Sequence, residues 1–118
     1  MKVFITGASS GIGEALAVCY AAQGATLGLA ARREESLAGL NRRLGVGHAC
    51  YPLDVTDAPA LHAAAADFMA RFGVPDIVIA NAGVSAGTLT TRVRQFAAKS
   101  GVFRKAPHVT MRVSGGFS

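Results

Sequence analysis

Residues 6–13 read Thr-Gly-Ala-Ser-Ser-Gly-Ile-Gly, directly after the apolar run Val3-Phe4-Ile5 and at the start of a helical pattern. The first glycine can adopt the backbone angles of a tight turn between a strand and a helix. The other two keep side chains away where a pyrophosphate approaches the backbone and where the helix packs on the sheet. The first turn of such a helix offers unpaired N–H groups and the positive end of its dipole to an anion. The spacing therefore predicts a phosphate-binding turn made by Gly7, Ser9, Ser10, Gly11, Ile12 and Gly13.

Outward from this turn, short strand-like segments alternate with longer helix-like segments as far as Asn81. The predicted strands are 2–6, 25–31, 48–53 and 77–80, and the predicted helices are 12–23, 35–44 and 58–72. Such alternation is typical of βαβ units with a parallel sheet. We therefore expect an α/β fold: a partial Rossmann fold, with a doubly wound parallel sheet in the strand order 3-2-1-4 and right-handed crossovers.

Glycines at 24, 45 and 73 are placed to end the three helices, and Asp57 can cap the start of the third. Each helix also carries apolar residues at helical spacing, which we expect to face the sheet: Ile12, Ala15, Leu16, Cys19 and Tyr20 in the first, Leu37, Leu40 and Leu44 in the second, and Leu61, Ala65, Phe68 and Phe72 in the third. Cys19 and Cys50 lie in apolar contexts without the spacing of a disulfide or metal site, so we expect both to be buried as small hydrophobic residues.

The composition is that of one globular domain. The chain has 118 residues, of which 51% are hydrophobic, which is enough for a core and outside the range of disordered chains. No apolar run is long enough to span a bilayer, and no leader-like segment precedes Val3. We therefore expect a cytoplasmic location and no membrane partner.

The net charge of +5 comes from the end of the chain. Residues 88–118 hold six basic side chains and no acidic one, whereas residues 1–87 hold six basic and seven acidic side chains. Such a break in composition marks a boundary, so we expect a Rossmann half-domain at 1–87 and a basic, irregular tail at 88–118, with a hint of a helix only at 93–103. The tail has no nucleic-acid-binding motif. Non-specific binding of nucleic acid or other anions is the alternative to a solvated tail.

Two arginines follow the second predicted strand, at the edge where open α/β sheets bind ligands. A dinucleotide fold that prefers NAD presents an Asp or Glu at this position, and this chain has Arg32 and Arg33. Because a guanidinium can make paired hydrogen bonds to a 2′-phosphate, the two arginines favour NADP over NAD as the cofactor. The alternative is that they are the solvated start of the next helix, which Glu34 and Glu35 continue.

The third and fourth predicted strands also end in candidate cofactor residues. Asp54 could accept a hydrogen bond from the adenine amino group while the Val55 N–H donates to the ring, although turn and cap chemistry would also place an Asp here. The fourth strand ends in Asn81-Ala82-Gly83. Its small residues would let a cofactor approach the backbone, and the Asn amide could bridge neighbouring loops, but a plain turn explains the triplet equally well.

Taken in this order, the four features resemble the short-chain dehydrogenase/reductase family. The turn matches the family's Thr-Gly-x-x-x-Gly-Ile-Gly motif, Asp54 falls at its adenine-contacting aspartate, and residues 81–83 match its Asn-Ala-Gly motif. Ala80 stands where the family usually has a second Asn. The resemblance covers residues 1 to about 87 and implies a Rossmann fold, hydride transfer between NADP(H) and an alcohol or ketone, and assembly into dimers or tetramers.

The family's catalytic Tyr-x-x-x-Lys, in which the Lys lowers the pKa of the phenol, is absent. Four residues after Tyr20 and Tyr51 stand Gly24 and Val55. The resemblance therefore predicts a truncated, nucleotide-binding chain without catalytic residues or turnover, in which an alcohol or ketone would be a substrate only of a full-length relative. We also expect residues 88–118 to derive from an altered reading frame.

A non-catalytic interaction fragment that pairs with reductase subunits is a further alternative. In that interpretation the fourth strand, Ile77-Val78-Ile79, is an exposed sheet edge, open to strand addition, and the folded state is marginal.

Overall fold

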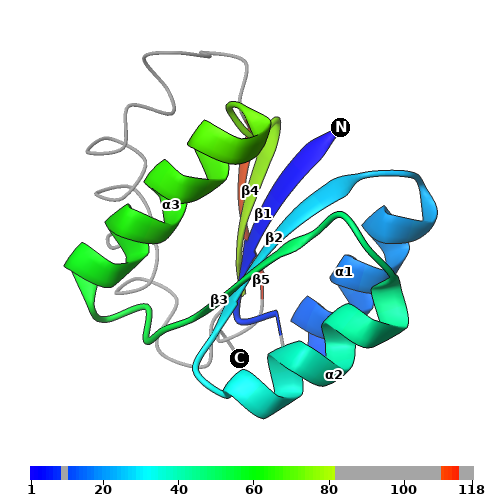
Figure 1. The fold of residues 1–118 in the computed structure, drawn as a ribbon, viewed down its shortest axis with the longest axis horizontal. Helices are drawn as coiled ribbons and strands as arrows, with labels where there is room; N and C mark the ends of the chain where they lie inside the picture. The colour runs from blue at the N-terminus through cyan, green and yellow to red at the C-terminus, as the bar shows by residue number, and fades with distance from the viewer. Residues whose placement is uncertain (9–10, 82–109, 115–118) are drawn as a thin grey trace.

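A five-stranded parallel sheet runs through the centre of the molecule, in the order β3-β2-β1-β4-β5 (Figure 1). The computed structural model describes residues 1–8, 11–81 and 110–114. The strands are β1 (Lys2–Thr6), β2 (Thr26–Ala31), β3 (Ala49–Pro52), β4 (Ile77–Asn81) and β5 (Thr110–Ser114). The predicted order 3-2-1-4 and the α/β class are confirmed.

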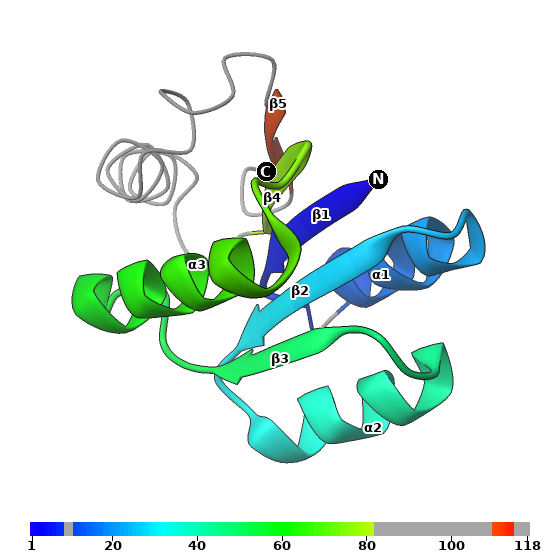
Figure 2. The same cartoon turned by 45° about the horizontal axis from the view of Figure 1, so that its top comes forward.

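Three helices connect the strands, α1 (Gly11–Ala22), α2 (Glu34–Leu44) and α3 (Ala58–Phe72). Figure 2 shows α1 and α2 on one face of the sheet and α3 on the other. The predicted caps are present: the Asp57 carboxylate accepts a hydrogen bond from the Ala60 N–H at 3.2 Å, and Gly45 and Gly73 end α2 and α3 with φ of 97°. No helix among the described residues is long and apolar enough to cross a membrane.

Side chains alternate between the two faces of the sheet, as the pleat of a strand requires. On the α3 side the core is built around Phe4, Phe68 and Val78, and on the α1–α2 side around Ile5, Leu29 and Leu37. Because β1 lies between β2 and β4, its side chains contribute to both halves of the core.

The buried face of α1 differs from the sequence prediction. Gly13 and Ala17 are the buried residues of the helix, Leu16 and Tyr20 are half-buried, and three predicted core residues, Ile12, Ala15 and Cys19, are exposed. The prediction of a buried Cys19 is therefore wrong, while Cys50 on β3 is half-buried. The cause is that α1 is apolar on nearly every side, so its hydrophobic spacing does not select one face.

The alternative in which β4 is an exposed sheet edge does not agree with the structure. β5 pairs with β4 in parallel, with Ile77 opposite Thr110 and Asn81 opposite Ser114. The tail is thus not irregular at residues 110–114, whose backbone completes the hydrogen bonding of β4 and removes its open edge. Ser9, Ser10, Ala82, Gly83 and the helix predicted at 93–103 lie outside the described residues.

Candidate nucleotide site

The glycine turn after β1 has the backbone that its sequence predicts. Gly7 has φ of 69° and Gly11 has φ of 46°, a region that residues with a side chain rarely adopt. A Cβ added at Gly11 would meet no atom within 4 Å among the described residues that are not its chain neighbours, so that part of the structure leaves this face of the turn open. Gly13 is buried where α1 lies against the sheet. The turn therefore combines close helix packing with an open backbone face, as a bound pyrophosphate requires.

Hydrogen bonds between neighbouring strand ends hold this edge of the sheet together. The Ala8 N–H donates to the Ala30 carbonyl at 3.2 Å, and the Leu53 N–H donates to the Ala31 carbonyl at 2.9 Å. The register places Thr6 opposite both Ala30 and Ala80. Because the strands are parallel, Gly7 after β1, Arg32 after β2, Asp54 after β3 and Asn81 at the end of β4 share one edge of the sheet.

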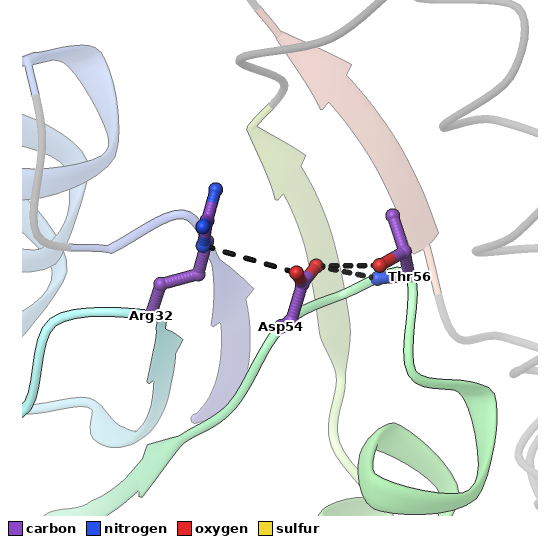
Figure 3. A network of polar contacts seen from close by, with 3 residues as sticks. All are labelled: Arg32, Asp54 and Thr56. Atoms are coloured by element: carbon purple, nitrogen blue, oxygen red, sulfur yellow. Dashed lines mark hydrogen bonds and ion pairs between the residues drawn. The ribbon is translucent and has the colours of Figure 1, made fainter.

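Arg32, Asp54 and Thr56 form a polar network at this edge (Figure 3). Arg32 Nε lies 3.8 Å from Asp54 Oδ2, and the two side chains are 79% and 44% exposed. Asp54 Oδ1 accepts hydrogen bonds from the Thr56 N–H at 2.9 Å and from the Thr56 hydroxyl at 2.8 Å. Because both side chains are exposed, the ion pair adds little to stability, and its main effect is to position the arginine. In Figure 3 the end of the guanidinium beyond Nε points away from the carboxylate.

The hydrogen bonds from the Thr56 backbone and side chain, with a smaller contribution from Arg32, lower the pKa of Asp54. The group is therefore a carboxylate at neutral pH and can only accept hydrogen bonds. The structure contains the turn that was the alternative explanation of Asp54. Its Oδ1 accepts a hydrogen bond from the Thr56 N–H, which forms an Asx turn. The adenine contact stays a prediction. The Val55 side chain packs against the core on the α3 side, and the adenine contact of its backbone stays a prediction.

Arg33 occupies the N-cap position of α2, where its side chain makes no capping hydrogen bond. The side chains of Arg32 and Arg33 are both exposed. Glu34 and Glu35 fill the first turn of the helix, as the solvated-helix alternative expected. Both interpretations of the arginine pair therefore agree with the backbone, and the cofactor contact of Arg33 stays a prediction.

The sequence did not identify Thr56 as part of the site, although it donates two hydrogen bonds to Asp54. Its spacing from Asp54 is that of an Asx turn, and this signal was used only as an alternative explanation of the aspartate. The Arg32–Asp54 ion pair had no sequence signal, because it joins the ends of two different strands.

Tyr51 does not lie in an environment suited to acid–base catalysis at neutral pH. The Tyr51 hydroxyl donates to Asp67 Oδ2 on α3 at 2.7 Å, and burial together with this carboxylate raises the pKa of Tyr51 far above its usual value. A catalytic phenol needs the opposite shift, which a nearby cation provides.

Comparison with known proteins agrees with the fold and the motifs. A family model described as short chain dehydrogenase matches residues 1–105. The probable oxidoreductase EphD of Mycobacterium tuberculosis is 41% identical over 100 residues, which are 80% of this chain and 17% of that protein. The match to the family continues past residue 87, where the resemblance was expected to end.

Two solved structures show the same arrangement. L-sorbose reductase from Gluconobacter frateurii, in complex with NADPH and L-sorbose, has a TM-score of 0.74 at 26% identity, over 88% of this chain and 48% of that one. The 3-ketoacyl-(acyl-carrier-protein) reductase from Brucella melitensis, in complex with NADH, has a TM-score of 0.67 at 25% identity, over 91% and 49%. The chain thus spans about half the length of these enzymes. By its fold, its glycine turn and this match, the chain belongs to the short-chain dehydrogenase/reductase family.

Proposed function

We propose that this chain binds NADP(H) as the cofactor-binding half of a short-chain dehydrogenase/reductase and has no turnover by itself. In the complete reaction the cofactor supplies or accepts a hydride, and the partner compound is an alcohol or a ketone. The residues proposed to hold the dinucleotide are the glycine turn for the pyrophosphate, Asp54 and Val55 for the adenine, and residues 81–83 near the nicotinamide end.

The observation that carries the choice of NADP is the position of Arg32. Its side chain is 79% exposed at the end of β2, at the edge that carries the glycine turn. A 2′-phosphate is a dianion with acceptor oxygens, and a guanidinium is the group best suited to bind it. An acidic residue at this place would instead bind the ribose diol of NAD. The related reductases were solved with NADPH in one case and NADH in the other, so the arginine is what supports the preference.

Titration calorimetry with NADPH and NADH tests the proposal. We expect tighter binding of NADPH, and we expect Arg32→Ser to weaken NADPH binding by about 10-fold to 100-fold, because a hydrogen bond to a charged group contributes about 1.5–3 kcal/mol. Binding of NADH should change little. Arg42→Ser is the matched control, since Arg42 is an exposed arginine in the last turn of α2. Equal affinities for the two dinucleotides in the unmodified chain would contradict the NADP preference.

The proposed lack of turnover follows from the absence of a Tyr-x-x-x-Lys pair in this sequence, since Gly24 and Val55 stand four residues after Tyr20 and Tyr51. We expect no oxidation of NADPH when the pure chain is mixed with L-sorbose or a simple ketone, even where calorimetry shows that NADPH binds. Oxidation of NADPH in proportion to added ketone would contradict this part of the proposal and leave the binding part intact.

A further inference from the structure

Thr56 lies at the nucleotide edge but makes none of the cofactor contacts proposed above. It is an exposed residue in the turn between β3 and α3, two residues after Asp54. Its N–H donates to Asp54 Oδ1 at 2.9 Å, and its hydroxyl donates to the same oxygen at 2.8 Å. The N–H bond alone forms the Asx turn. The hydroxyl therefore adds a second constraint on the Asp54 carboxylate.

The two oxygens of this carboxylate have different partners. Oδ1 accepts both hydrogen bonds from Thr56, whereas Oδ2 lies 3.8 Å from Arg32 Nε. Figure 3 shows the carboxylate between the two side chains, with Thr56 on one side and Arg32 on the other. Because a carboxylate is planar and rigid, a bond that fixes the position of Oδ1 also fixes the direction of Oδ2. The Thr56 hydroxyl thus helps to determine where Oδ2 meets the arginine.

The ion pair uses only one end of the guanidinium. Nε faces Asp54 Oδ2, and the part of the group beyond Nε points away from the carboxylate (Figure 3). The two terminal nitrogens carry most of the N–H donors of an arginine, and a phosphate accepts two such N–H groups side by side. Asp54 can therefore orient Arg32 while leaving it the donors that a 2′-phosphate needs.

Orientation matters here because the Arg32 side chain is 79% exposed. A long exposed side chain adopts many rotamers, and ordering it when a ligand binds lowers the affinity. A contact that orders it beforehand removes part of that cost. On the basis of the proposed NADP(H) site, we infer that Thr56 is a positioning residue for the choice of cofactor. It acts through Asp54 on Arg32, whose guanidinium it keeps directed at the 2′-phosphate.

Thr56→Val tests this role, because it removes the hydroxyl and keeps the N–H and nearly the same shape. The readout is the ratio of the Kd values for NADH and NADPH from titration calorimetry. The pyrophosphate and adenine contacts are common to both dinucleotides, and only NADPH has the 2′-phosphate. We expect the preference for NADPH to fall by about threefold to tenfold, the cost of ordering one long side chain, with unchanged affinity for NADH. Thr56→Ser, which keeps the hydroxyl, should retain the preference.

A double-mutant cycle separates positioning from a general effect on the turn. In a chain that already carries Arg32→Ser, no guanidinium remains to be oriented. Thr56→Val should then leave the ratio of the two Kd values unchanged, because coupled residues are not additive. The same loss in both backgrounds would show that the hydroxyl acts without Arg32.

The orientation of Arg32 can also be measured without a cofactor. The Nε–H group of an ordered arginine gives an NMR signal whose order parameter reports its motion, and Arg32→Ser identifies this signal by its loss. We expect a lower order parameter in Thr56→Val than in the unmodified chain, and no change in Thr56→Ser. An equal order parameter in all three proteins would overturn the positioning role.

The binding results distinguish failure of this role from failure of the proposed function. Equal affinities of the unmodified chain for NADPH and NADH, or binding of neither, would overturn both. A preference for NADPH that Arg32→Ser abolishes and Thr56→Val leaves intact would overturn the positioning role alone. A stronger preference in Thr56→Val would also overturn it, because Asp54 would then compete with the 2′-phosphate for the arginine.

Discussion

At the scale of single residues, Gly28 in the middle of β2 is required by its neighbours rather than by its backbone angles. A Cβ at this position would lie 2.7 Å from ring carbons of both Phe4 and Phe68, which are fully buried. The two rings meet edge to face, with centroids 5.6 Å apart, and cannot both move aside. We expect Gly28→Ala to lower the free energy of unfolding by about 1–3 kcal/mol through overpacking, measured by urea denaturation.

Gly39→Ala is the control for this substitution. Gly39 lies inside α2, and a Cβ there would meet only the Arg42 side chain at 3.9 Å. Alanine should raise the stability by about 0.5–1 kcal/mol, because glycine is a poor residue for a helix interior. If Gly28→Ala proved as stable as Gly39→Ala, the packing of the two rings would not be the constraint described above.

In the candidate site, the sequence predicted individual residues but not the contact between them. The glycine turn, Arg32 and Asp54 could be identified because each follows a recognisable strand, and the structure places all three at one edge. The ion pair between Arg32 and Asp54 could not be predicted. It depends on the distance between the ends of two strands, which no local pattern contains.

At the scale of elements, His48 completes the pairing of β2 with β3. The first backbone pair of these strands is Gly28 with Ala49. One residue earlier, the Leu27 N–H donates to Nδ1 of the His48 side chain at 3.1 Å. The imidazole thus takes the place of a carbonyl in the ladder, and it can do so only while Nδ1 carries no proton.

This role makes stability depend on pH. Burial lowers the pKa of His48 below its usual 6.5, and a hydrogen bond with the Leu44 backbone opposes this only partly. The unfolded chain therefore binds the proton first as the pH falls through about 6.5, and the free energy of unfolding decreases until the pH is below the pKa of the folded state. Urea denaturation at several values between pH 8 and pH 5 should show this decrease.

His48→Asn tests the assignment, because an Asn side chain keeps an acceptor for the Leu27 N–H but does not titrate. We expect the variant to lack the part of the decrease that His48 causes. The same slope in both proteins between pH 7 and pH 5 would show that another group is responsible.

The start of α3 allows a second prediction at this scale. Asp57→Ala removes the hydrogen bond to the Ala60 N–H and should cost about 1 kcal/mol, within a range of about 0.5–2 kcal/mol for such caps. Thermal and urea denaturation measure this loss. Asp57→Asn, which keeps an oxygen acceptor, should recover most of it, and an equal loss in both variants would point to the charge instead.

Helices and strands could be predicted where the hydrophobic spacing agreed with the residues that cap helices or form turns. The four strands and three helices of residues 1–81 were placed to within about two residues, the usual uncertainty of such bounds. The face of α1 was misassigned because its solvent side is as apolar as its buried side. β5 was missed because Thr-Met-Arg-Val-Ser has no apolar run, and its place beside β4 depends on a pairing between distant parts of the chain.

At the scale of the whole molecule, cofactor binding should be visible as stability. A ligand that binds only the folded state raises the free energy of unfolding, by about 2.7 kcal/mol at one hundred times its Kd. If the proposed site binds NADPH, urea denaturation at saturating NADPH should show an increase of this size, and the same concentration of NADH should give a smaller one. No increase in a sample that calorimetry shows to bind NADPH would mean that the unfolded chain binds it equally well.

The position of the first residue also has a practical consequence. β1 lies in the middle of the sheet, the Lys2 N–H donates to Asp76 at 2.8 Å, and Met1 is exposed at the end of β1 opposite the glycine turn (Figure 1). A purification tag, a biotin or a fluorophore joined to Met1 would therefore leave the molecule on the side away from the nucleotide edge. Chains immobilised on a sensor chip in this way would present that edge to the flowing solution, all in the same orientation.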